Sequence, residues 1–560
     1  MRFKIDMDMQ AVCRHGVLWL LLVAGPVVGE EMAALEAAVP AALDTMHSLS
    51  GTSGLPLHDT LLQQVYQQRA GEPIWYAGGK LNSRAERLMA AISEVAAEGL
   101  SPRDYVLPEL DPAGLTPPQE TKNPDEFLLT EIYLRLAHDL HSGQFKPQEL
   151  DPYWHLPVDA FDPDEAMRQL LLQSEPNRLI NALSPPYPGY QRLRQALQTY
   201  RQLASQGGWP ALPEFPTLRP GEHAPEVPLL RHRLQLEGDH PDGEPTDATD
   251  YDDVLQASVR RFQRRNGLVE DGVVGAQTRA ALNISVEERI EQIRANMERW
   301  RWLPRDLGDQ YVLVNTAGFD LTLVLDGQPV LHQRTINGTH ERQTPSFASR
   351  ITHLVVNPKW TVPRLIAVKD LLPKQQRDAE FFKRMEIQVF QSEGGQWVQL
   401  DPLTINWRRY HKNYFPFMLR QAPGDHNSLG RIKFLMNNPY DIYLHDTPAK
   451  GLFQKPIRAF SSGCIRVQGV DQLARRLLQN GGQSPEETLD EPLHSLQTHI
   501  QRLARPVPVY LVYFTAWEDD EGLINFRPDI YQRNNDLVLA LRGEATKFTA
   551  SNTPDTVNSL

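Results

Sequence analysis

Hydrophobic positions along residues 58–208 follow the period of an α-helix. Apolar side chains recur at spacings of three and four, for example within 61–66 and within 127–137. Proline clusters near 107–118 and 146–157 interrupt this pattern. The pattern predicts an irregular helical scaffold domain, in which no residues of evident chemistry are found.

A second helical unit is predicted at 229–283. It follows a proline-rich stretch at 209–228, which is expected to be a linker. An amphipathic helix at 259–268 ends at a glycine in the C-terminal capping position, and a tight turn at 271–275 leads into a further helix. The unit is therefore predicted to be small and helical.

The hydrophobic period changes at about residue 310, from the helical period to the alternation of strands. A charged helix at 285–304 connects the small helical unit to this region. Strand-like segments follow at 311–315, 319–325, 330–336, 351–357, 442–444 and 507–514. We predict a mainly β domain at 310–515 with a few helices, which makes the chain a multidomain α+β protein.

The composition is that of an ordinary globular protein. The chain has 560 residues, of which 41% are apolar and 23% charged, enough for about three or four domains. Its net charge of −13 argues against non-specific nucleic-acid binding, which needs a basic surface. No polybasic cluster adjoins an apolar segment, so recognition of anionic lipids is not indicated.

The chain begins with the pattern of an export signal. An arginine and a histidine precede an apolar run at 16–28, which is shorter than the about 20 residues that span a membrane. We predict a signal peptide at 1–29 and an extracytoplasmic location, with retention as a membrane anchor as the alternative. Residues 30–57 are expected to be a loosely ordered lead-in, 516–545 a C-terminal extension and 546–560 a disordered tail.

The mature protein is expected to keep a single cysteine. The chain has two cysteines, and Cys13 lies at the edge of the predicted signal. The remaining Cys464 has no partner for an internal disulfide in an oxidising compartment, so it is either an inert buried residue or a reactive thiol. The surrounding glycine, serines and arginine in Ser461–Arg466 favour a reactive thiol.

The residue types near Cys464 suit acyl transfer, which needs a nucleophile, a proton acceptor and donors for a developing oxyanion. Cys464 is the predicted nucleophile and His445 the predicted base, with eighteen residues between them. The two are expected to rest either as a neutral pair or as a thiolate–imidazolium pair. The N–H groups of Cys464 and Gly463 and the Tyr443 hydroxyl are candidate oxyanion donors, since residues 443 and 445 share one face of a strand.

Other residues of the same loop are expected to support the site. Gly463 keeps the backbone open for the substrate. Ser462 is expected to support the oxyanion site, and Ser461 either to bind substrate or to structure the loop. Arg466 either binds a substrate carboxylate or ties down the loop, and the second role is preferred. No Cys-x-x-Cys or His-Glu-x-x-His pattern occurs, so neither a metal nor another cofactor is expected.

Four motifs together resemble the L,D-transpeptidase (YkuD-type) catalytic domain over about 200 residues. They are Asn337-Gly338 with Gln343-Thr344-Pro345, Pro423-Gly424 with Asn427-Ser428-Leu429-Gly430, Tyr443-Leu444-His445-Asp446-Thr447, and Ser461-Ser462-Gly463-Cys464-Ile465-Arg466. Many family members carry histidine at the position of Ser462, which leaves the role of that side chain open. A Phe-Arg-Pro-Asp-Ile-Tyr segment near the C-terminus extends the resemblance to the large Gram-negative, YcbB-like subgroup.

Two other regions also resemble parts of such proteins. The unit at 229–283 resembles the three-helix peptidoglycan-binding domain, through its Phe-Gln helix, Asp-Gly-x-x-Gly turn and Thr-x-x-Ala-Leu helix. Some domains of that family are only spacers, so the resemblance implies the fold more firmly than glycan binding. The segment 361–421, rich in aromatic and basic residues, corresponds to a capping subdomain over the active site, and an additional packed subdomain is the alternative.

The resemblance implies an enzyme of the periplasm or the inner membrane that forms 3→3 crosslinks in peptidoglycan. A cysteine thioester would form with release of D-Ala from a tetrapeptide stem, and a diaminopimelate amine would resolve it. Carbapenems as covalent inhibitors and other cell-wall synthases are further implied partners. The alternatives are an L,D-carboxypeptidase or lipoprotein-attaching transpeptidase with the same acyl-enzyme, and a non-catalytic wall-binding scaffold.

Overall fold

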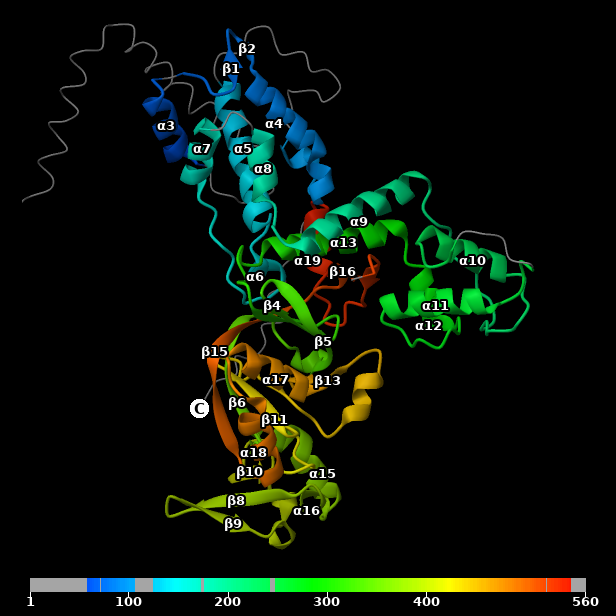
Figure 1. The fold of residues 1–560 in the computed structure, drawn as a ribbon, viewed down its shortest axis with the longest axis vertical. Coiled ribbons are helices and arrows are strands. Elements are labelled where there is room, and N and C mark those ends of the chain that lie inside the picture. The colour runs from blue at the N-terminus through cyan, green and yellow to red at the C-terminus, as the bar shows by residue number, and fades with distance from the viewer. Residues whose placement is uncertain are drawn as a thin grey trace, which may run out of the picture. The chain divides into compact units, whose positions relative to one another are not determined.

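The computed structural model of this protein describes residues 58–70, 72–105, 124–172, 176–241, 247–519 and 521–544. They form two compact units, each described here by itself (Figure 1). The predicted signal peptide, lead-in and tail lie outside the described residues. Within the described ranges, no helix is long and apolar enough to cross a membrane.

The first unit, Met1–Lys146 with Asp159–Arg194, is helical in its described part, as the sequence predicts. Its elements are α3 (Asp59–Gln68), β1 (Tyr76–Ala77), β2 (Lys80–Leu81), α4 (Ser83–Glu94), η2 (Val95–Glu98), η3 (Pro102–Tyr105), α5 (Pro124–Ser142), α7 (Pro163–Leu172), α8 (Pro176–Leu183) and the start of α9 (Pro188–Ser205). Their apolar faces share one buried core. Four of these helices begin with proline, which is favoured at the first helical position. Many prolines of this region therefore start helices.

The second unit, Pro147–Val158 with Gln195–Leu560, contains the predicted small helical subdomain. Its helices are α10 (Val227–Leu236), α11 (Asp253–Arg265) and α12 (Ala276–Leu282). The Gln263 side chain holds the predicted turn, because its Oε1 accepts from the N–H of Gly272 at 2.8 Å and its Nε2 donates to the carbonyl of Val273 at 3.0 Å. Gly267, just after α11, has the left-handed φ of +66° that favours glycine.

The segment 209–228 is not the linker that its prolines suggest. Trp209, Leu212 and Phe215 are buried, and the last two belong to the core of the small helical subdomain. The Trp209 indole N–H also donates to the carbonyl of Ile284 at 2.9 Å. The prediction of a linker is therefore wrong, because the apolar residues between the prolines pack against α10 to α12.

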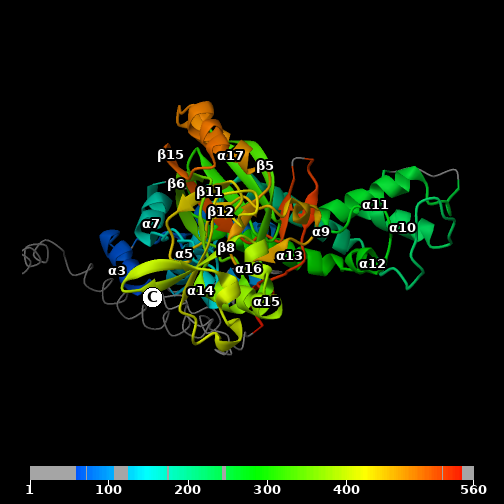
Figure 2. The same cartoon turned by 90° about the horizontal axis from the view of Figure 1, so that it is seen from below.

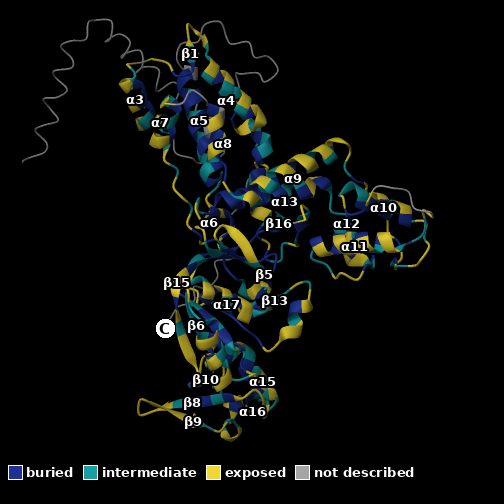
Figure 3. Ribbon diagram, viewed as in Figure 1, coloured by how far each residue is buried: buried dark blue, intermediate teal, exposed yellow. Residues whose placement is uncertain are grey.

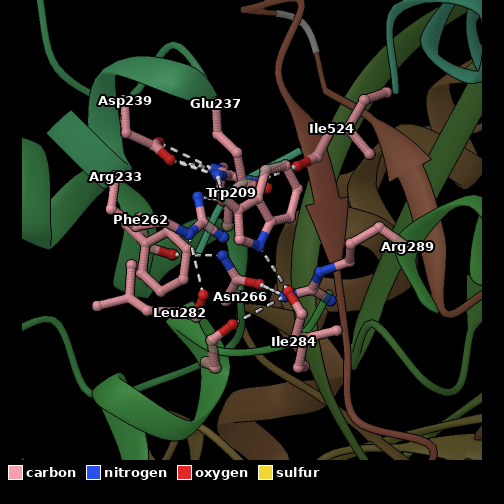
Figure 4. Close-up of polar contacts among 12 residues, drawn as sticks. Trp209, Arg233, Glu237, Asp239, Phe262, Asn266, Leu282, Ile284, Arg289 and Ile524 are labelled. Carbon is pink, nitrogen blue, oxygen red and sulfur yellow. Dashed lines mark hydrogen bonds and ion pairs between the residues drawn. The ribbon is translucent and has the colours of Figure 1, made fainter. Parts of the chain in front are cut away.

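Buried arginines and acidic residues join this subdomain to the C-terminal segment (Figure 4). Arg265 on α11 donates from Nε to Asp239 at 2.8 Å and from Nη1 to the carbonyl of Ile524 at 3.2 Å. Glu237 lies 2.7 Å from Arg233 and 3.1 Å from Arg265. Burial alone would raise the pKa of Glu237, but three guanidinium groups, led by that of Arg265, hold it at about 2. Because these charges are buried, they must stay paired.

The main β domain is built on a nine-stranded sheet. Its order is β13-β5-β14-β12-β11-β6-β15-β3-β4, and β5 also pairs with β4. The strands are β3 (Tyr311–Asn315), β4 (Asp320–Leu325), β5 (Gln328–Gly338), β6 (Ala348–Val356), β11 (Ile432–Met436), β12 (Leu444–His445), β13 (Ala459–Ser461), β14 (Ile465–Val467) and β15 (His499–Val512). Helix α17 (Val470–Asn480) packs its buried leucines into the core of this sheet (Figure 2). The predicted strands are confirmed, with shifted ends.

The segment 361–421 forms a subdomain with its own core, which we call the cap. Four strands in the order β7-β10-β8-β9 make its sheet. Its elements are β7 (Trp360–Thr361), α14 (Arg364–Ile366), η5 (Ala367–Leu371), α15 (Leu372–Arg377), α16 (Phe381–Arg384), β8 (Ile387–Glu393), β9 (Gln396–Leu400), η6 (Pro402–Thr404), η7 (Trp407–Arg409) and β10 (Phe417–Gln421). Strand β9, at the sheet edge, is largely exposed (Figure 3), whereas Trp407 and Phe382 are buried in the core.

The C-terminal extension is bound to the predicted connecting helix, α13 (Val286–Arg301). It contains β16 (Ala516–Glu518), β17 (Ile524–Phe526) and α19 (Asn535–Leu541). Asn296 on α13 accepts from the N–H of Thr515 at 2.8 Å, and Arg299 donates to the carbonyl of Arg533 at 2.9 Å. The extension is thus an integral part of the second unit.

Replacing Arg265 tests whether the buried ion cluster holds the small helical subdomain in place. Arg265→Met leaves two buried carboxylates with too few cations to pair with. Such a loss typically lowers the free energy of unfolding by about 3–5 kcal/mol. The neighbouring Arg264 is half exposed and pairs with Glu521 at 3.3 Å on the surface, so Arg264→Met should change stability by no more than about 1 kcal/mol. Chemical denaturation of both variants measures the difference, and equal losses would contradict the role given to the cluster.

Candidate functional site

Three short strands place the predicted site residues on one face of the main sheet. Strand β11 pairs with β12 so that Lys433 lies opposite His445, and β12 pairs with β14 so that His445 lies opposite Arg466. Cys464 directly precedes β14, and the N–H of Ile465 donates to the carbonyl of Tyr443 at 3.1 Å. Because alternate residues of a strand share a face, Lys433, His445 and Arg466 lie on the same face as Tyr443 and Cys464, opposite the buried Ile465.

The loop that carries Cys464 is fixed by the side chain of Ser461. Its Oγ donates to the carbonyl of Cys464 at 2.5 Å and accepts from the N–H of Gly463 at 3.1 Å. Gly463 has a φ of +115°, where only glycine is unstrained. Ser461 thus structures the loop, which is one of the two roles that the sequence left open for it. The Gly463 N–H already has a partner, however, so the candidate oxyanion donors are reduced to the Cys464 N–H and the Tyr443 hydroxyl.

A second loop, after β5, supports the Cys464 loop. The Thr344 hydroxyl donates to the carbonyl of Gly463 at 2.8 Å and accepts from the N–H of Gly338 at 3.0 Å. A Cβ on Gly338 would lie 2.0 Å from the carbonyl oxygen of Arg342, so this position requires glycine. Arg533 of the C-terminal extension donates to the carbonyl of Thr344 at 3.0 Å. The extension therefore braces the site through this loop.

Arg342 links the Cys464 loop to the cap. Its Nη1 donates to the Ser462 hydroxyl at 2.8 Å, and its Nη2 donates to Oδ1 of Asp370, in η5 of the cap, at 2.7 Å. The hydrogen bonds with Asp370 raise the pKa of Arg342, so it remains charged. Ser462, whose role the sequence left open, thus serves as the attachment point of this link.

His445 is buried and neutral. Its Nδ1 lies 2.5 Å from the carbonyl oxygen of Asp446, which can only accept, so Nδ1 carries the proton and Nε2 is left as the basic atom. Burial, followed by the positive charge of Arg466, lowers the pKa of His445 to about 3. The ring is therefore able to accept a proton but does not hold one at rest.

Asp446 is held in place by its surroundings on β11. Its N–H donates to the carbonyl of Ile432 at 2.9 Å, and its Oδ2 accepts from the N–H of Arg431 at 3.0 Å. A Cβ on Gly430 would approach the Asp446 side chain to 2.4 Å, and Gly430 has a φ of +61°. The glycine of the second motif thus makes room for the residue that orients His445.

Tyr443 lies between Cys464 and the cap. Burial raises the pKa of its hydroxyl, as does the hydrogen bond to Cys464, so the group stays protonated and able to donate. The Trp360 side chain hydrogen-bonds to the same hydroxyl, and the Tyr443 ring packs against the cap core. Tyr443 is therefore suitably placed as an oxyanion donor.

Cys464 rests as a thiol. The side chain is half-buried, and its Sγ lies 3.6 Å from the carbonyl oxygen of Asp441, an arrangement in which S–H donates. Burial raises its pKa, although hydrogen bonds from Tyr443 and the charge of Lys433 oppose this. Together with the low pKa of His445, these shifts favour the neutral pair over the thiolate–imidazolium pair.

Arg466 does not tie down the loop in the way that was preferred from the sequence. Within the described part of the chain, its guanidinium makes no hydrogen bond or ion pair, and its Nε is buried without a partner. Ser461 and Thr344 fix the loop instead. Sequence reasoning also missed Lys433, although a cation within the apolar run 432–436, close before a catalytic motif, was a usable signal.

A metal centre is not found at this site. Among the residues that the structure describes, no three His, Cys, Asp or Glu side chains are grouped so that they could hold a metal ion. The arrangement offers a thiol, a neutral imidazole and hydrogen-bond donors, which together suit nucleophilic acyl transfer.

The protonation states predict how Cys464 reacts with a small electrophile. Alkylation by iodoacetamide should accelerate about tenfold per pH unit between pH 6 and 8, because only the thiolate reacts and the raised pKa keeps its fraction small. Mass spectrometry of the Cys464 peptide measures the rate, with glutathione as the reference thiol. A rate already constant from about pH 5 would instead indicate a resting thiolate–imidazolium pair.

Gly430→Ala should disturb the orientation of His445. The added methyl group would contact Asp446, and alanine is strained in the left-handed backbone conformation of this position. The free energy of unfolding should fall by about 1–3 kcal/mol. We expect a lower melting temperature and slower alkylation of Cys464. Gly451→Ala is the matched control, since a Cβ there has nothing within 4 Å; if both variants behave alike, the close contact with Asp446 does not matter.

Comparison with known families agrees with this geometry. Residues 309–498 match the sequence model of the L,D-transpeptidase catalytic domain, residues 223–282 that of the "Putative peptidoglycan binding domain" and residues 60–197 that of a scaffold domain. A Haemophilus influenzae protein named "Putative L,D-transpeptidase" is 37% identical over 257 residues, which are 46% of this chain and 51% of that protein. The chain thus spans about half the length of this relative.

Two solved structures are also similar, but only weakly. The L,D-transpeptidase from Xylanimonas cellulosilytica is 18% identical, with 53% of this chain and 98% of that chain covered and a TM-score of 0.16. The L,D-transpeptidase from Stackebrandtia nassauensis is 13% identical, with 46% and 88% covered and a TM-score of 0.21. Both TM-scores are too low to support an argument.

The matched sequence models cover the motifs of the candidate site. The match at 309–498 contains all four motifs, and the region carries the mainly β fold that these motifs imply. The chain carries an L,D-transpeptidase catalytic domain of the YkuD family, together with a peptidoglycan-binding domain and a scaffold domain.

Proposed function

We propose that this protein is a cysteine transpeptidase that acts on the stem peptides of peptidoglycan. One observation carries the proposal: the half-buried Cys464 thiol is hydrogen-bonded to Tyr443 and lies next to the strand that carries the buried, neutral His445. The domain that contains them matches L,D-transpeptidases. The matched peptidoglycan-binding domain supports the choice of substrate.

In the proposed acylation, Nε2 of His445 takes the thiol proton and Cys464 attacks the carbonyl of the third stem residue. The Cys464 N–H and the Tyr443 hydroxyl donate to the oxyanion that forms. The tetrahedral intermediate then expels the amine of D-Ala, which receives the proton from His445. The products are free D-Ala and a thioester on Cys464.

In the proposed second step, a diaminopimelate side-chain amine of a neighbouring stem attacks the thioester. His445 takes a proton from the attacking amine and returns it to the departing sulfur, which leaves a 3→3 crosslink. Water would compete for the same thioester, so the enzyme needs to limit access of water to it. The cap, joined to the Cys464 loop through Arg342 and Asp370, is the element suited to this task.

Other outcomes of the same acyl-enzyme differ only in the acceptor. Water would make the enzyme an L,D-carboxypeptidase, and a lipoprotein amine would make it an anchoring enzyme. A non-catalytic wall-binding scaffold has less support, because a thiol and a neutral imidazole lie on neighbouring strands, with a tyrosine hydroxyl hydrogen-bonded to the thiol. Carbapenems should acylate Cys464, and export to the periplasm remains part of the proposal, supported by the apolar run at 16–28.

Purified tetrapeptide muropeptides test the function directly. Wild type should release D-Ala and form crosslinked dimers, whereas Cys464→Ala should lower the rate at least about a thousandfold. His445→Gln should lower kcat by about 100- to 10,000-fold, because it removes the base. Chromatography of the muropeptides measures both products.

The same chromatogram separates the alternatives. Tripeptide monomers without dimers would identify a hydrolase. Crosslinks formed by Cys464→Ala would refute the thioester mechanism, provided that the melting temperature of the variant matches wild type.

A further inference from the structure

Two cations beside Cys464 have no anionic partner among the residues that the structure describes. The Lys433 ammonium lies 3.6 Å from the centre of the Tyr443 ring and makes no ion pair within the described residues. The Arg466 guanidinium likewise has neither an ion pair nor a hydrogen bond there, and its Nε is buried. Both side chains are only half-exposed. Such groups usually acquire an anion, because burying an unpaired charge is costly.

The strand register places these cations on either side of His445. Lys433 is its partner on β11 and Arg466 its partner on β14. Neighbouring strands are about 4.8 Å apart, so the backbones of Lys433 and Arg466 are separated by about 10 Å. The long side chains of a lysine and an arginine can reach a common anion across this distance. Cys464 precedes Arg466 by two residues and shares its face. An anion held by both cations therefore lies next to the nucleophile.

The electrostatics agree with an excess of positive charge around Cys464. Burial is the main cause that lowers the pKa of Lys433 and the pKa of Arg466. The nearby Cys464 acts in the opposite direction and raises both pKa values. The exposed Asp441 is the other acidic group that acts on Lys433. Since Cys464 rests as a thiol, it does not neutralise either cation before the reaction.

The proposed donor carries a carboxylate at the required place. The terminal carboxylate of its leaving D-Ala is separated from the scissile nitrogen by a single carbon, whereas its other carboxylates lie several bonds farther from the attacked carbonyl. We propose that Lys433 and Arg466 bind this terminal carboxylate, and that Lys433 is thereby a specificity residue for donors that end at the leaving D-amino acid. This inference rests on the proposed transpeptidase function.

The pair would give the enzyme two properties at once. It would position the scissile amide over Cys464, and it would reject stems in which the leaving residue is followed by another residue or lacks its charge. A charge-assisted hydrogen bond lost from such a site typically lowers affinity about 10- to 100-fold.

Two synthetic donors test the proposal with the full-length protein. One is the tetrapeptide L-Ala-γ-D-Glu-meso-diaminopimelate-D-Ala, and the other is the same peptide with a C-terminal carboxamide. Release of D-Ala or D-alaninamide gives kcat/KM for each. We expect wild type to prefer the carboxylate about 10- to 100-fold, mainly through KM. Lys433→Met should remove most of this preference by slowing only the carboxylate donor, and Lys433→Arg should retain it.

Two controls separate recognition of the carboxylate from other roles of Lys433. Alkylation of Cys464 by neutral iodoacetamide measures the effect of the Lys433 charge on the thiolate alone, since no donor carboxylate is involved. In Lys433→Met it should slow much less than kcat/KM for the carboxylate donor falls. Lys455→Met, at an exposed lysine of the same domain, should leave both kinetics and alkylation unchanged.

Several results would overturn the proposal. Equal wild-type rates for both donors exclude a carboxylate-binding pair. Equal slowing of both donors in Lys433→Met, together with slow alkylation, assigns Lys433 to stabilising the thiolate instead. If Lys433→Met does not fold, the wild-type preference and its retention in Lys433→Arg still decide the matter. Failure of wild type to release an amine from either donor would instead reject the proposed function itself.

Discussion

The site depends on the short parallel pairing of β12 with β14. This pairing sets His445 beside Arg466 and brings Tyr443 next to Cys464. A shift of one residue in either strand would turn the side chains of that strand to the opposite face. The register is protected by buried apolar neighbours, Leu444 and Ile465, which belong to the core of the sheet. Packing of these two residues thus fixes the chemistry on the other face.

Support for the Cys464 loop comes from distant parts of the chain. Thr344 binds the loop, Arg533 binds Thr344, and Arg299 of α13 binds the carbonyl of Arg533. Arg533 is also stacked 4.8 Å from the centre of the Tyr513 ring, so it is held from several sides. The peptidoglycan-binding domain joins the same C-terminal segment through Arg265. Segments that are far apart in the sequence therefore support the loop through a chain of hydrogen bonds.

Strands and short motifs could be predicted from the sequence because they depend on neighbouring residues. Contacts between segments that are distant in the sequence could not. Periodicity predicted the strands, and the Cys464 and His445 motifs predicted two residues that the strand pairing brings together at the candidate site. The linker at 209–228 was predicted wrongly because proline content hid the buried Trp209 and Phe215. Lys433, Arg342 and Asp446 gained their roles only through pairing across strands and loops. The neutral state of the pair follows from burial, which no motif encodes.

The central claim is that Cys464 forms a thioester with the donor stem. Intact-protein mass spectrometry after brief mixing with tetrapeptide donor, in the absence of an acceptor amine, tests it most directly. The account predicts an added mass equal to the donor minus one D-alanine, which peptide mapping assigns to Cys464 and which hydroxylamine removes. Turnover of the donor with no adduct on Cys464, or with an adduct on another residue, would contradict the account.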